Sequence, residues 1–435
     1  MTTLETGQSD QRLKAHRTPL SAPVNVDPSR WPDIARVPHK PLRAAVARQL
    51  LYGAVRRLQL RVSFPNGDQW GAGGADTPVL RLIRPDHFVQ RVGANGLIGF
   101  GESYMAGDWE ADDVTAVLTV MASQLSTLIP PRLQRLRQAA VLRTPSWQDN
   151  TLDGARDNIQ HHYDLSNDLF RRFLDQSLSY SSALFDGDPA NTTESLESAQ
   201  HRKVDRMLDE AGVTHGTRLL EIGTGWGELA IRAASRGAHV TTVTLSDEQA
   251  ALANERVAAA GLSDLVDIQL RDYREVTGRF DAIVSVEMYE AVGAPHWPEY
   301  FGALDALLEP GGRVCLQAIT MPHDRMLASM NTYTWILKYI FPGGQIASVQ
   351  AIQEQLSRTS LRVASNYAFG QHYAETLRRW RATFEANAVE VDALGFDQVF
   401  RRMWSLYLAY SEAGFRSAYL DVNQFTLVKA PKDGS

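Results

Sequence analysis

LLEIGTGWGELAIRAASRGAHVTTVTLS, residues 219–246, places three glycines between two apolar runs. The runs LLEIG and HVTTVTLS are typical of strands, and the segment between them has the composition of a helix. Gly223, Gly225 and Gly227 stand where the first strand passes into the helix. Glycines permit a tight turn there and a close approach of a ligand to backbone N–H groups. The stretch predicts a strand–loop–helix–strand unit with a ligand at the end of its first strand.

The same alternation continues along the chain after Asn158. The strand-like runs VDIQLRD (266–272), FDAIVSVE (280–287) and RVCLQAI (313–319) alternate with helical segments. Such alternation predicts βαβ units on a parallel sheet, with ligands at the carboxyl ends of the strands. A late pair, LRVASNYAF (361–369) and NQFTLVK (423–429), is expected to close one edge of the sheet. Two helical segments, about 373–389 and 394–413, lie between them.

The N-terminal part of the chain lacks this regular alternation of strands and helices. Residues 1–38 are polar and proline-rich and are expected to form a disordered tail. Residues 39–127 are expected to form a small α+β domain. It begins with a helix over 42–58, continues with the strands LQLRVSF and PVLRLIR with PNGD as the turn between them, and ends with a helix from about Asp113. Residues 128–150 form a basic linker, and residues 151–435 form the larger domain.

The bulk composition restricts the class of partner. The 435 residues carry a formal net charge of −6 and are 44% hydrophobic, which indicates a globular protein without general attraction to nucleic acid. We find no apolar stretch of spanning length and no signal peptide, and the single cysteine, Cys315, suits a reducing compartment. A cytoplasmic protein is expected. The basic, leucine-containing stretch LIPPRLQRLRQAAVLRTPSW (128–147) is interpreted either as a solvated linker helix or as a contact with the inner, anionic membrane surface.

The spacing of the glycines in the loop restricts the class of ligand. G-x-G-x-G departs from the dinucleotide fingerprint, and no G-K-S/T follows for a phosphate cradle. An acidic residue entering the loop, Glu221, suits a cationic amino-acid portion. The pattern resembles motif I of class I S-adenosylmethionine methyltransferases, which implies an α/β fold with a Rossmann-like sheet. An added helical lid and the small N-terminal α+β domain are expected beside that sheet. The cofactor contacts expected on this basis are Tyr163, Tyr180, Ser181, Glu221, Gly223, Thr224, Gly225, Trp226, Thr244, Leu245, Ser246, Gln249, Asp272 and Tyr273.

Several motifs carry a narrower resemblance, over about residues 40–430. IQHHYDLSNDLF (159–170), YSSALF (180–185), SLESAQHRKVDRML (195–208), SVEMYEAVG (285–293), KYIFPGG (338–344) and GESYMAGDWE (101–110) resemble those of cyclopropane fatty acid and mycolic acid cyclopropane synthases. Within that superfamily, EAVG, LQAITMP and YSEAGFRS are most similar to actinobacterial 10-methylene fatty acid synthases, which make precursors of tuberculostearic acid. A metal site at His161, His162 and Asp164 is not favoured, because adjacent histidines point in different directions.

The resemblance implies a reaction and a site. The double bond of an oleoyl-type phospholipid chain attacks the sulfonium methyl group, and a base removes a proton from the resulting carbocation. In the family that base is a bound bicarbonate. It is held by the backbone at the position of a cysteine and by a glutamate, a histidine and a tyrosine. The matching positions are Ser182, Glu290, Gln317 and Tyr373, and Ile319 is included with them. Gln317 replaces the histidine; a neutral amide can hydrogen-bond an anion but cannot titrate near pH 7.

Alternatives and partners remain open at this point. Loss of a proton from the added methyl gives a cyclopropane, whereas a preceding hydride shift gives a 10-methylene chain, which we favour. A methyltransferase acting on another small lipid and a non-catalytic lipid-binding protein are the other candidates. The expected partners are unsaturated phospholipid chains, a peripheral membrane surface, a reductase acting on a methylene product, and a second copy of the chain in a homodimer.

Overall fold

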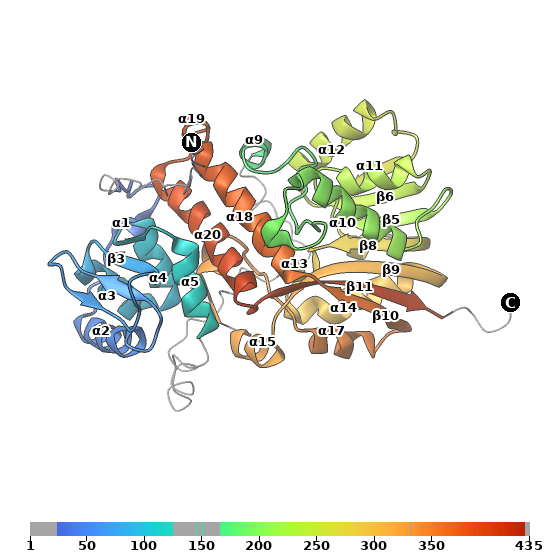
Figure 1. Ribbon diagram of the computed structural model, residues 1–435. Coiled ribbons are helices and arrows are strands. Elements are labelled where there is room, and N and C mark those ends of the chain that lie inside the picture. The colour runs from blue at the N-terminus through green and yellow to red at the C-terminus, as the bar shows by residue number, and fades with distance from the viewer. Residues whose placement is uncertain (1–23, 125–144, 146–149, 151–165, 331, 431–435) are drawn as a thin grey trace, which may run out of the picture.

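The computed structural model describes residues 24–124, 145, 150, 166–330 and 332–430, and Figure 1 shows two units side by side. The N-terminal unit contains α1 (Pro32–Ala35), α2 (Pro41–Val55), β1 (Arg61–Ser63), β2 (Gln69–Trp70), β3 (Val79–Leu82), α3 (Pro85–Asn95), α4 (Leu97–Met105), β4 (Trp109–Ala111) and α5 (Val114–Ser123). It is a small α+β unit, as its sequence predicts.

The second unit carries a seven-stranded sheet. Its strands are β5 (Arg218–Ile222), β6 (His239–Thr244), β7 (Val266–Leu270), β8 (Phe280–Val286), β9 (Leu308–Thr320), β10 (Leu361–Ala368) and β11 (Asp421–Lys429). The helices are α9 (Asn167–Arg171), η2 (Pro189–Asn191), α10 (Leu196–Glu210), α11 (Glu228–Ser235), α12 (Asp247–Ala259), η3 (Tyr273–Glu275), α13 (Tyr289–Val292), η4 (Ala294–His296), α14 (Trp297–Leu307), α15 (His323–Ser329), α16 (Trp335–Tyr339), α17 (Val349–Leu356), α18 (Gly370–Ala386), α19 (Ala388–Ala393) and α20 (Gln398–Arg416).

The strand order is β10-β11-β9-β8-β5-β6-β7. Strands β5 to β9 run parallel, and β11 pairs antiparallel with both β9 and β10. The late strand pair therefore closes one edge, as predicted. Because the chain order reverses between β5 and β8, the carboxyl ends of these two strands lie at a switch point where open α/β sheets bind ligands.

Alternating side chains of the central strands supply two separate cores. On β8, Ala282 and Val284 pack with α10 and α11, whereas Ile283 packs with α14 and α17 on the other face. On β9, the Cys315 side chain joins the first core and its neighbours Val314 and Leu316 join the second. This period of two is expected for strands covered on both faces, and Figure 1 shows helices above and below the sheet.

Two N-terminal predictions need correction. The PNGD turn leads from β1 into the short antiparallel strand β2, not into the PVLRLIR strand, which instead pairs parallel with β1 as β3. Residues 24–38, expected to belong to a disordered tail, include the helix α1, and its Ile34 is buried in the core. A two-residue strand and a single buried isoleucine leave too little periodicity to be detected. The 128–147 stretch falls almost entirely outside the described residues, so its two interpretations stay open.

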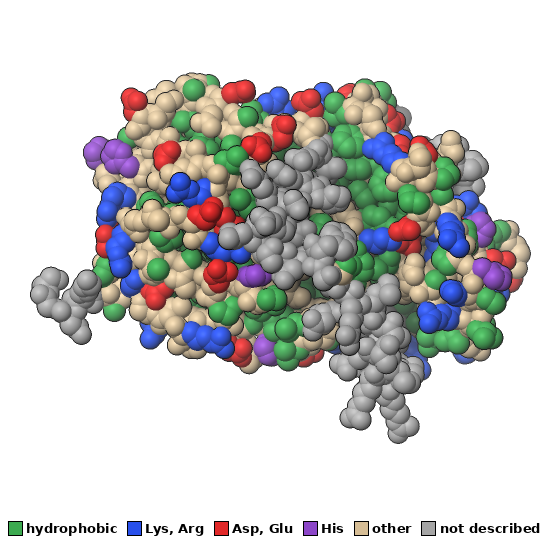
Figure 2. Space-filling model, turned by 180° about the vertical axis from the view of Figure 1, so that it is seen from behind, with side chains coloured by type: hydrophobic (Ala, Val, Ile, Leu, Met, Phe, Trp, Pro, Cys, Tyr) green, Lys and Arg blue, Asp and Glu red, His purple; other side chains and the backbone are tan. Residues whose placement is uncertain are grey.

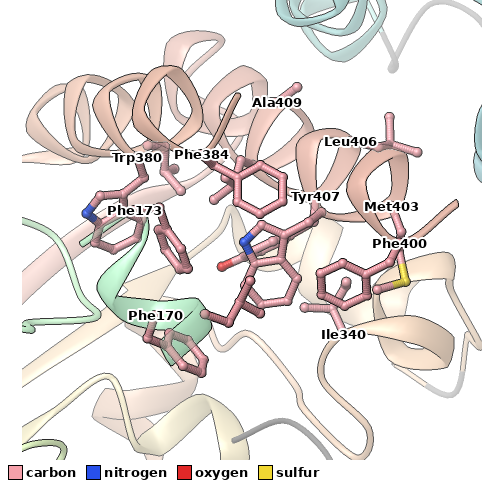
Figure 3. Close-up of a cluster of buried hydrophobic side chains, with 14 of the residues drawn as sticks. Phe170, Phe173, Ile340, Trp380, Phe384, Phe400, Met403, Leu406, Tyr407 and Ala409 are labelled. Carbon is pink, nitrogen blue, oxygen red and sulfur yellow. The ribbon is translucent and has the colours of Figure 1, made fainter. Parts of the chain in front are cut away.

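The N-terminal unit packs against α20 through its helices α4 and α5. An aromatic cluster from α9, α18 and α20 fills the space between the sheet and this unit; Figure 3 labels Phe170, Phe173, Trp380, Phe384 and Tyr407 among its members. Met105 of α4 belongs to the same cluster. In the described part of the chain no helix is long and apolar enough to cross a membrane.

Candidate active site

The glycine loop adopts the conformation that its sequence demands. Gly223, Gly225 and Gly227 have φ angles of 97°, 50° and 90°, which side-chain-bearing residues rarely adopt. A Cβ on Gly223 would lie 2.5 Å from Met288 Cγ, whereas a Cβ on Gly225 would meet no atom within 4 Å. Gly225 therefore faces open space, which leaves room for a ligand against the backbone.

That space is part of a cavity, open to solvent, at the carboxyl ends of β5, β6, β7 and β8; its empty volume, including the open solvent at its mouth, is about 1190 Å³. Of the expected cofactor contacts, it is lined by Tyr180, Ser181, Glu221, Gly223, Thr224, Gly225, Trp226, Thr244, Leu245, Gln249, Asp272 and Tyr273. Ser246 does not line it: its hydroxyl caps α12 by accepting from the Gln249 N–H over 3.2 Å. Tyr163 lies outside the described residues. Motif reasoning thus located the cavity from segments far apart in the sequence.

Two buried titratable side chains flank the loop. Glu221 is 2% exposed, and burial raises its pKa to about 8. Its Oε2 atom is buried and has no hydrogen-bond partner among the described residues. Lys203 of α10, which the sequence did not single out, is also buried, and burial lowers its pKa to about 8. Its ammonium group donates to Ser181 Oγ over 2.7 Å. An unpaired acceptor beside a cavity suits a ligand that brings a donor or a positive charge.

Two of the expected cofactor contacts, Asp272 and Tyr273, already have partners within the chain. Both carboxylate oxygens of Asp272 accept from the guanidinium of Arg274 over 2.8 Å, so this carboxylate is neutralised within the chain. Tyr273 is buried and packs edge-on against Tyr300. Arg274 also lines the cavity. This ion pair was not expected from the sequence, although Arg274 follows Asp272 by only two positions.

A second group of polar residues lies beside the cavity, around Glu287. The Ser182 N–H and the Gln317 side-chain amide donate to Glu287 Oε1 over 3.0 and 2.8 Å, and the Tyr373 hydroxyl donates to Glu287 Oε2 over 2.6 Å. Ser182 lies in the loop before α10, Gln317 on β9 and Tyr373 on the first turn of α18. Three distant segments therefore aim donors at one carboxylate.

Glu287 itself was not singled out from the sequence. It follows the last residue of β8 and lines the cavity. Its φ angle of 52° lies in the left-handed region, which is rare for a residue with a side chain and is found preferentially at functional sites. The available signal was an acidic residue at the carboxyl end of a buried parallel strand, next to the strand that enters the glycine loop.

Glu290 occupies a neighbouring position on α13. Its Oε1 accepts from the Ile319 N–H, and its buried Oε2 has no hydrogen-bond partner among the described residues. Burial, together with the nearby Glu287 charge, raises the pKa of Glu290 to about 8. The structure therefore divides the expected catalytic set: Ser182, Gln317 and Tyr373 contact Glu287, whereas Ile319 contacts Glu290.

Buried side chains behind Gln317 fix the direction of its amide. Gln424 of β11 donates to Gln317 Oε1 over 2.9 Å, and Arg206 of α10 donates to Gln424 Oε1. Because Gln317 Oε1 is used in this way, its NH2 group faces Glu287. Gln317 and Gln424 are both fully buried, so the chain of donors is shielded from water.

Aromatic side chains form the wall of the cavity on the side of α9, α18 and α20. Tyr180 lines it, and its hydroxyl is 2.7 Å from that of Tyr407 on α20. The Tyr180 ring packs against Phe170 and Trp380 with centroid distances of 5.2 and 5.3 Å. Such a wall excludes water and presents ring faces that attract positive charge.

Comparisons with known proteins agree on one family. A family model described as mycolic acid cyclopropane synthetase matches residues 150–425. The chain is 52% identical over 424 residues to tuberculostearic acid methyltransferase UfaA1 of Mycobacterium tuberculosis, covering 96% of this chain and 99% of that protein. It is 34% identical over 369 residues to a cyclopropane-fatty-acyl-phospholipid synthase of Escherichia coli, covering 84% and 90% of the two chains.

A solved structure has a similar fold over part of the chain. The mycolic acid cyclopropane synthase CmaA1, complexed with SAH and CTAB, aligns with a TM-score of 0.58 at 31% identity, covering 66% of this chain and 99% of the other. The match leaves about a third of the present chain uncovered.

Proposed function

The chain belongs to the mycolic acid cyclopropane synthetase family, and it is an S-adenosylmethionine-dependent methyltransferase that adds a carbon to the double bond of an unsaturated lipid acyl chain; we propose that its product is the 10-methylene chain. The observation that carries this choice is the 52% identity, over nearly the whole of both chains, to a relative named for tuberculostearic acid. A 10-methylene chain is the precursor that a reductase converts to such a 10-methyl acid, so we propose a reductase as the next enzyme.

The residues around the cavity fit S-adenosylmethionine. Its amino-acid portion brings an ammonium group, which suits the unpaired Glu221 Oε2, and Gly225 leaves open space for a ligand against the loop. When bound, S-adenosylmethionine supplies an electrophilic methyl group. We assign the holding of this molecule to the cavity residues Tyr180, Ser181, Glu221, Gly223, Gly225 and Gln249.

The chain must then protect a carbocation. The π electrons of the alkene form the new bond to carbon, and one former alkene carbon is left with a positive charge. The aromatic wall around Tyr180 stabilises that charge by about 1–2 kcal/mol and keeps out water, which would otherwise add to it. A hydride shift followed by loss of a proton from the added methyl gives the methylene; loss of the proton without the shift gives the ring.

The substrate is expected to reside in a membrane, and helix α2 has a surface suited to it. Leu42, Val46 and Leu50 recur every four residues along one face and are 85%, 60% and 55% exposed. The exposed arginines Arg43, Arg48, Arg56 and Arg57 lie on or directly after the same helix. On the face shown in Figure 2, hydrophobic side chains lie next to Lys and Arg at the end formed by the N-terminal unit. We propose that α2 docks this protein on the inner, anionic surface of the membrane.

Lipid analysis tests the function directly. A host that makes oleoyl phospholipids is transformed with the gene, and its fatty acids are analysed by mass spectrometry and NMR. We expect a gain of 14 mass units on monounsaturated chains and the signals of vinylidene protons. Cyclopropane proton signals in their place would refute the methylene product while leaving the reaction class intact. An unchanged lipid profile from soluble, S-adenosylmethionine-binding protein would refute the function.

A further inference from the structure

We propose that the carboxylate of Glu287 is the base of this reaction and takes the place of the bicarbonate that the family resemblance implies. The proposal rests on the proposed function, because it assigns the proton-accepting step of that reaction. It follows from the three donors that meet at Glu287 and from the position of this residue at the edge of the cavity.

The residues present do not fit a bound bicarbonate. Three of the four positions matched to the bicarbonate holders are Ser182, Gln317 and Tyr373, and their donors already bind the Glu287 carboxylate. The fourth, Glu290, lies close enough to Glu287 to influence its ionisation. A free anion would therefore have to displace a carboxylate covalently tied to the chain and lie beside its negative charge. Both the lost hydrogen bonds and the repulsion from the Glu287 carboxylate oppose this.

Hydrogen bonding distinguishes Glu287 from Glu290 as the proton acceptor. A base must be ionised, and donors to a carboxylate favour its charged form. Burial raises the pKa of Glu287, and three hydrogen bonds together with the positive charge of Lys203 limit that rise. Glu290 accepts only from backbone N–H groups, that of Ile319 and its own, and its pKa is about 8, so it is mainly protonated at neutral pH.

The backbone supports the assignment. A φ of 52° costs free energy for a residue with a side chain, on the order of 1 kcal/mol, and glycine would remove that cost. The Glu287 N–H donates to the Gln317 carbonyl over 2.8 Å, which holds the residue at the strand end in this strained conformation. The side chain is consequently directed to its three donors at the edge of the cavity.

The step balances without another reactant. A Glu287 oxygen forms a bond to a proton of the carbocation, and the electron pair of the broken C–H bond becomes the second bond of the methylene. Glu287 is then a neutral carboxylic acid, and it returns the proton to solvent through the open cavity. A carboxylate has about four lone-pair sites. Ser182 and Gln317 use those of Oε1 and Tyr373 uses one on Oε2, so one site on Oε2 remains for the proton.

Two variants of Glu287 test its role as the base: one is expected to lose turnover, and the other is expected to regain it when a small anion is added. Glu287→Gln keeps the shape but removes the basic oxygen, and we expect turnover to fall by about 10²-fold or more while S-adenosylmethionine still binds. Glu287→Gly relieves the strain and leaves a space facing three donors; we expect it to be inactive in buffer free of small anions and to regain at least tenfold activity with added formate or bicarbonate. Glu375→Gln, on α18 with Tyr373 but bound to Arg378 and Arg379, is the matched control.

The wild-type enzyme supplies the decisive comparison. We expect its rate to be the same in carbon-dioxide-depleted buffer and in buffer with added bicarbonate. A wild-type rate that requires bicarbonate, a Glu287→Gln variant with turnover within threefold of wild type, or a folded Glu287→Gly variant that no small anion rescues would each overturn the proposal. None of these results affects the proposed function, which fails only if the wild-type protein leaves unsaturated lipids unchanged.

Discussion

Gln317 and Glu287 bind each other twice, once through the backbone and once through their side chains. The Glu287 N–H donates to the Gln317 carbonyl over 2.8 Å, and the Gln317 amide donates to Glu287 Oε1 over 2.8 Å. The first bond joins the end of β8 to β9, and the second directs a neutral donor at the carboxylate. The uncharged amide of Gln317 stabilises the ionised form of Glu287 by donating a hydrogen bond, and it cannot accept a proton. A histidine in that place could accept the proton instead of Glu287.

Removing this donor should change the pH dependence of catalysis. In Gln317→Met the charged form of Glu287 loses one of three hydrogen bonds, so the pKa of Glu287 rises. Because the base acts only when ionised, the acid limb of the kcat profile should move to higher pH, with turnover at neutral pH reduced roughly tenfold. Steady-state rates between pH 5 and 9 measure both effects. An acid limb in the same position as that of the wild type would contradict a link between Gln317 and the base.

Gln317→His tests the product. A histidine restores the residue type that the family resemblance implies, but Glu287 still binds the other donors. We expect a smaller loss of turnover than in Glu287→Gln and a higher ratio of cyclopropane to methylene, because the imidazole changes the position of the acceptor. Lipid NMR measures this ratio. In combination with Glu287→Gly, the same histidine should make the rate depend on bicarbonate, and a double variant indifferent to bicarbonate would contradict this expectation.

The glycine loop can be tested by filling its open space. Gly225→Val places a side chain where no atom lies within 4 Å, in the space we assign to S-adenosylmethionine, so calorimetry should detect no binding. Valine is also strained at a φ of 50°, which requires a control for folding alone. Gly261→Val supplies it, because Gly261 has a φ of 70°, has equally open surroundings and does not line the cavity. Unchanged binding of S-adenosylmethionine by folded Gly225→Val would refute the assignment of this space to the cofactor.

Much of this architecture was predictable because it repeats along the chain. Runs such as FDAIVSVE and RVCLQAI are apolar on both faces, and the structure buries Ile283 on one side and Val284 on the other. The loop after β5 was predictable because Gly223 and Gly225 have conformations that few other residues adopt. The apolar runs and the glycines each lie within a short segment, so they can be recognised without knowledge of contacts between distant residues.

The features that sequence analysis missed depend on long-range contacts. The three donors that hold the Glu287 carboxylate lie 105, 30 and 86 residues away in the sequence, and only the folded chain brings them together. Motif comparison selected Glu290, three positions later, because the resemblance implies a glutamate there. The β2 strand was missed because two residues carry no periodicity. The order of residues 24–38 depends on contacts such as the Trp31 indole donating to Asp397 over 2.7 Å.

The α2 surface predicts measurable membrane binding. Replacing Leu42, Val46 and Leu50 with serine removes the exposed apolar stripe, and flotation with vesicles containing phosphatidylglycerol should fall at least fivefold. Binding of the wild type should increase with the anionic lipid fraction and decrease with salt, because the arginines contribute through screened charge. Val389→Ser is the control, since Val389 is 78% exposed on α19. Equal flotation of the triple variant would exclude α2 as the docking element.

Glu290 should make the ligand-free protein less stable as the pH rises. Its pKa is about 8 in the folded state against 4.5 ordinarily, so between these values the folded state binds more protons than the unfolded state. The free energy of unfolding contributed by this group is therefore fully present below about pH 4.5 and is lost as the pH rises toward 8. Glu290→Gln removes this dependence, and its Tm should exceed that of the wild type by more at pH 8.5 than at pH 6.

A carboxylate with the opposite shift gives the control for this prediction. Arg378 and Arg379 help to lower the pKa of Glu375, so Glu375→Gln removes a stabilising contribution that is present above the ordinary pKa. Its Tm should fall below that of the wild type at both pH values, because both lie well above the range in which Glu375 titrates. Thermal melts of the two variants at pH 6 and 8.5 separate these cases. A Tm difference between Glu290→Gln and wild type that is the same at both pH values would mean that Glu290 is ionised throughout, and it would then compete with Glu287 as the proton acceptor.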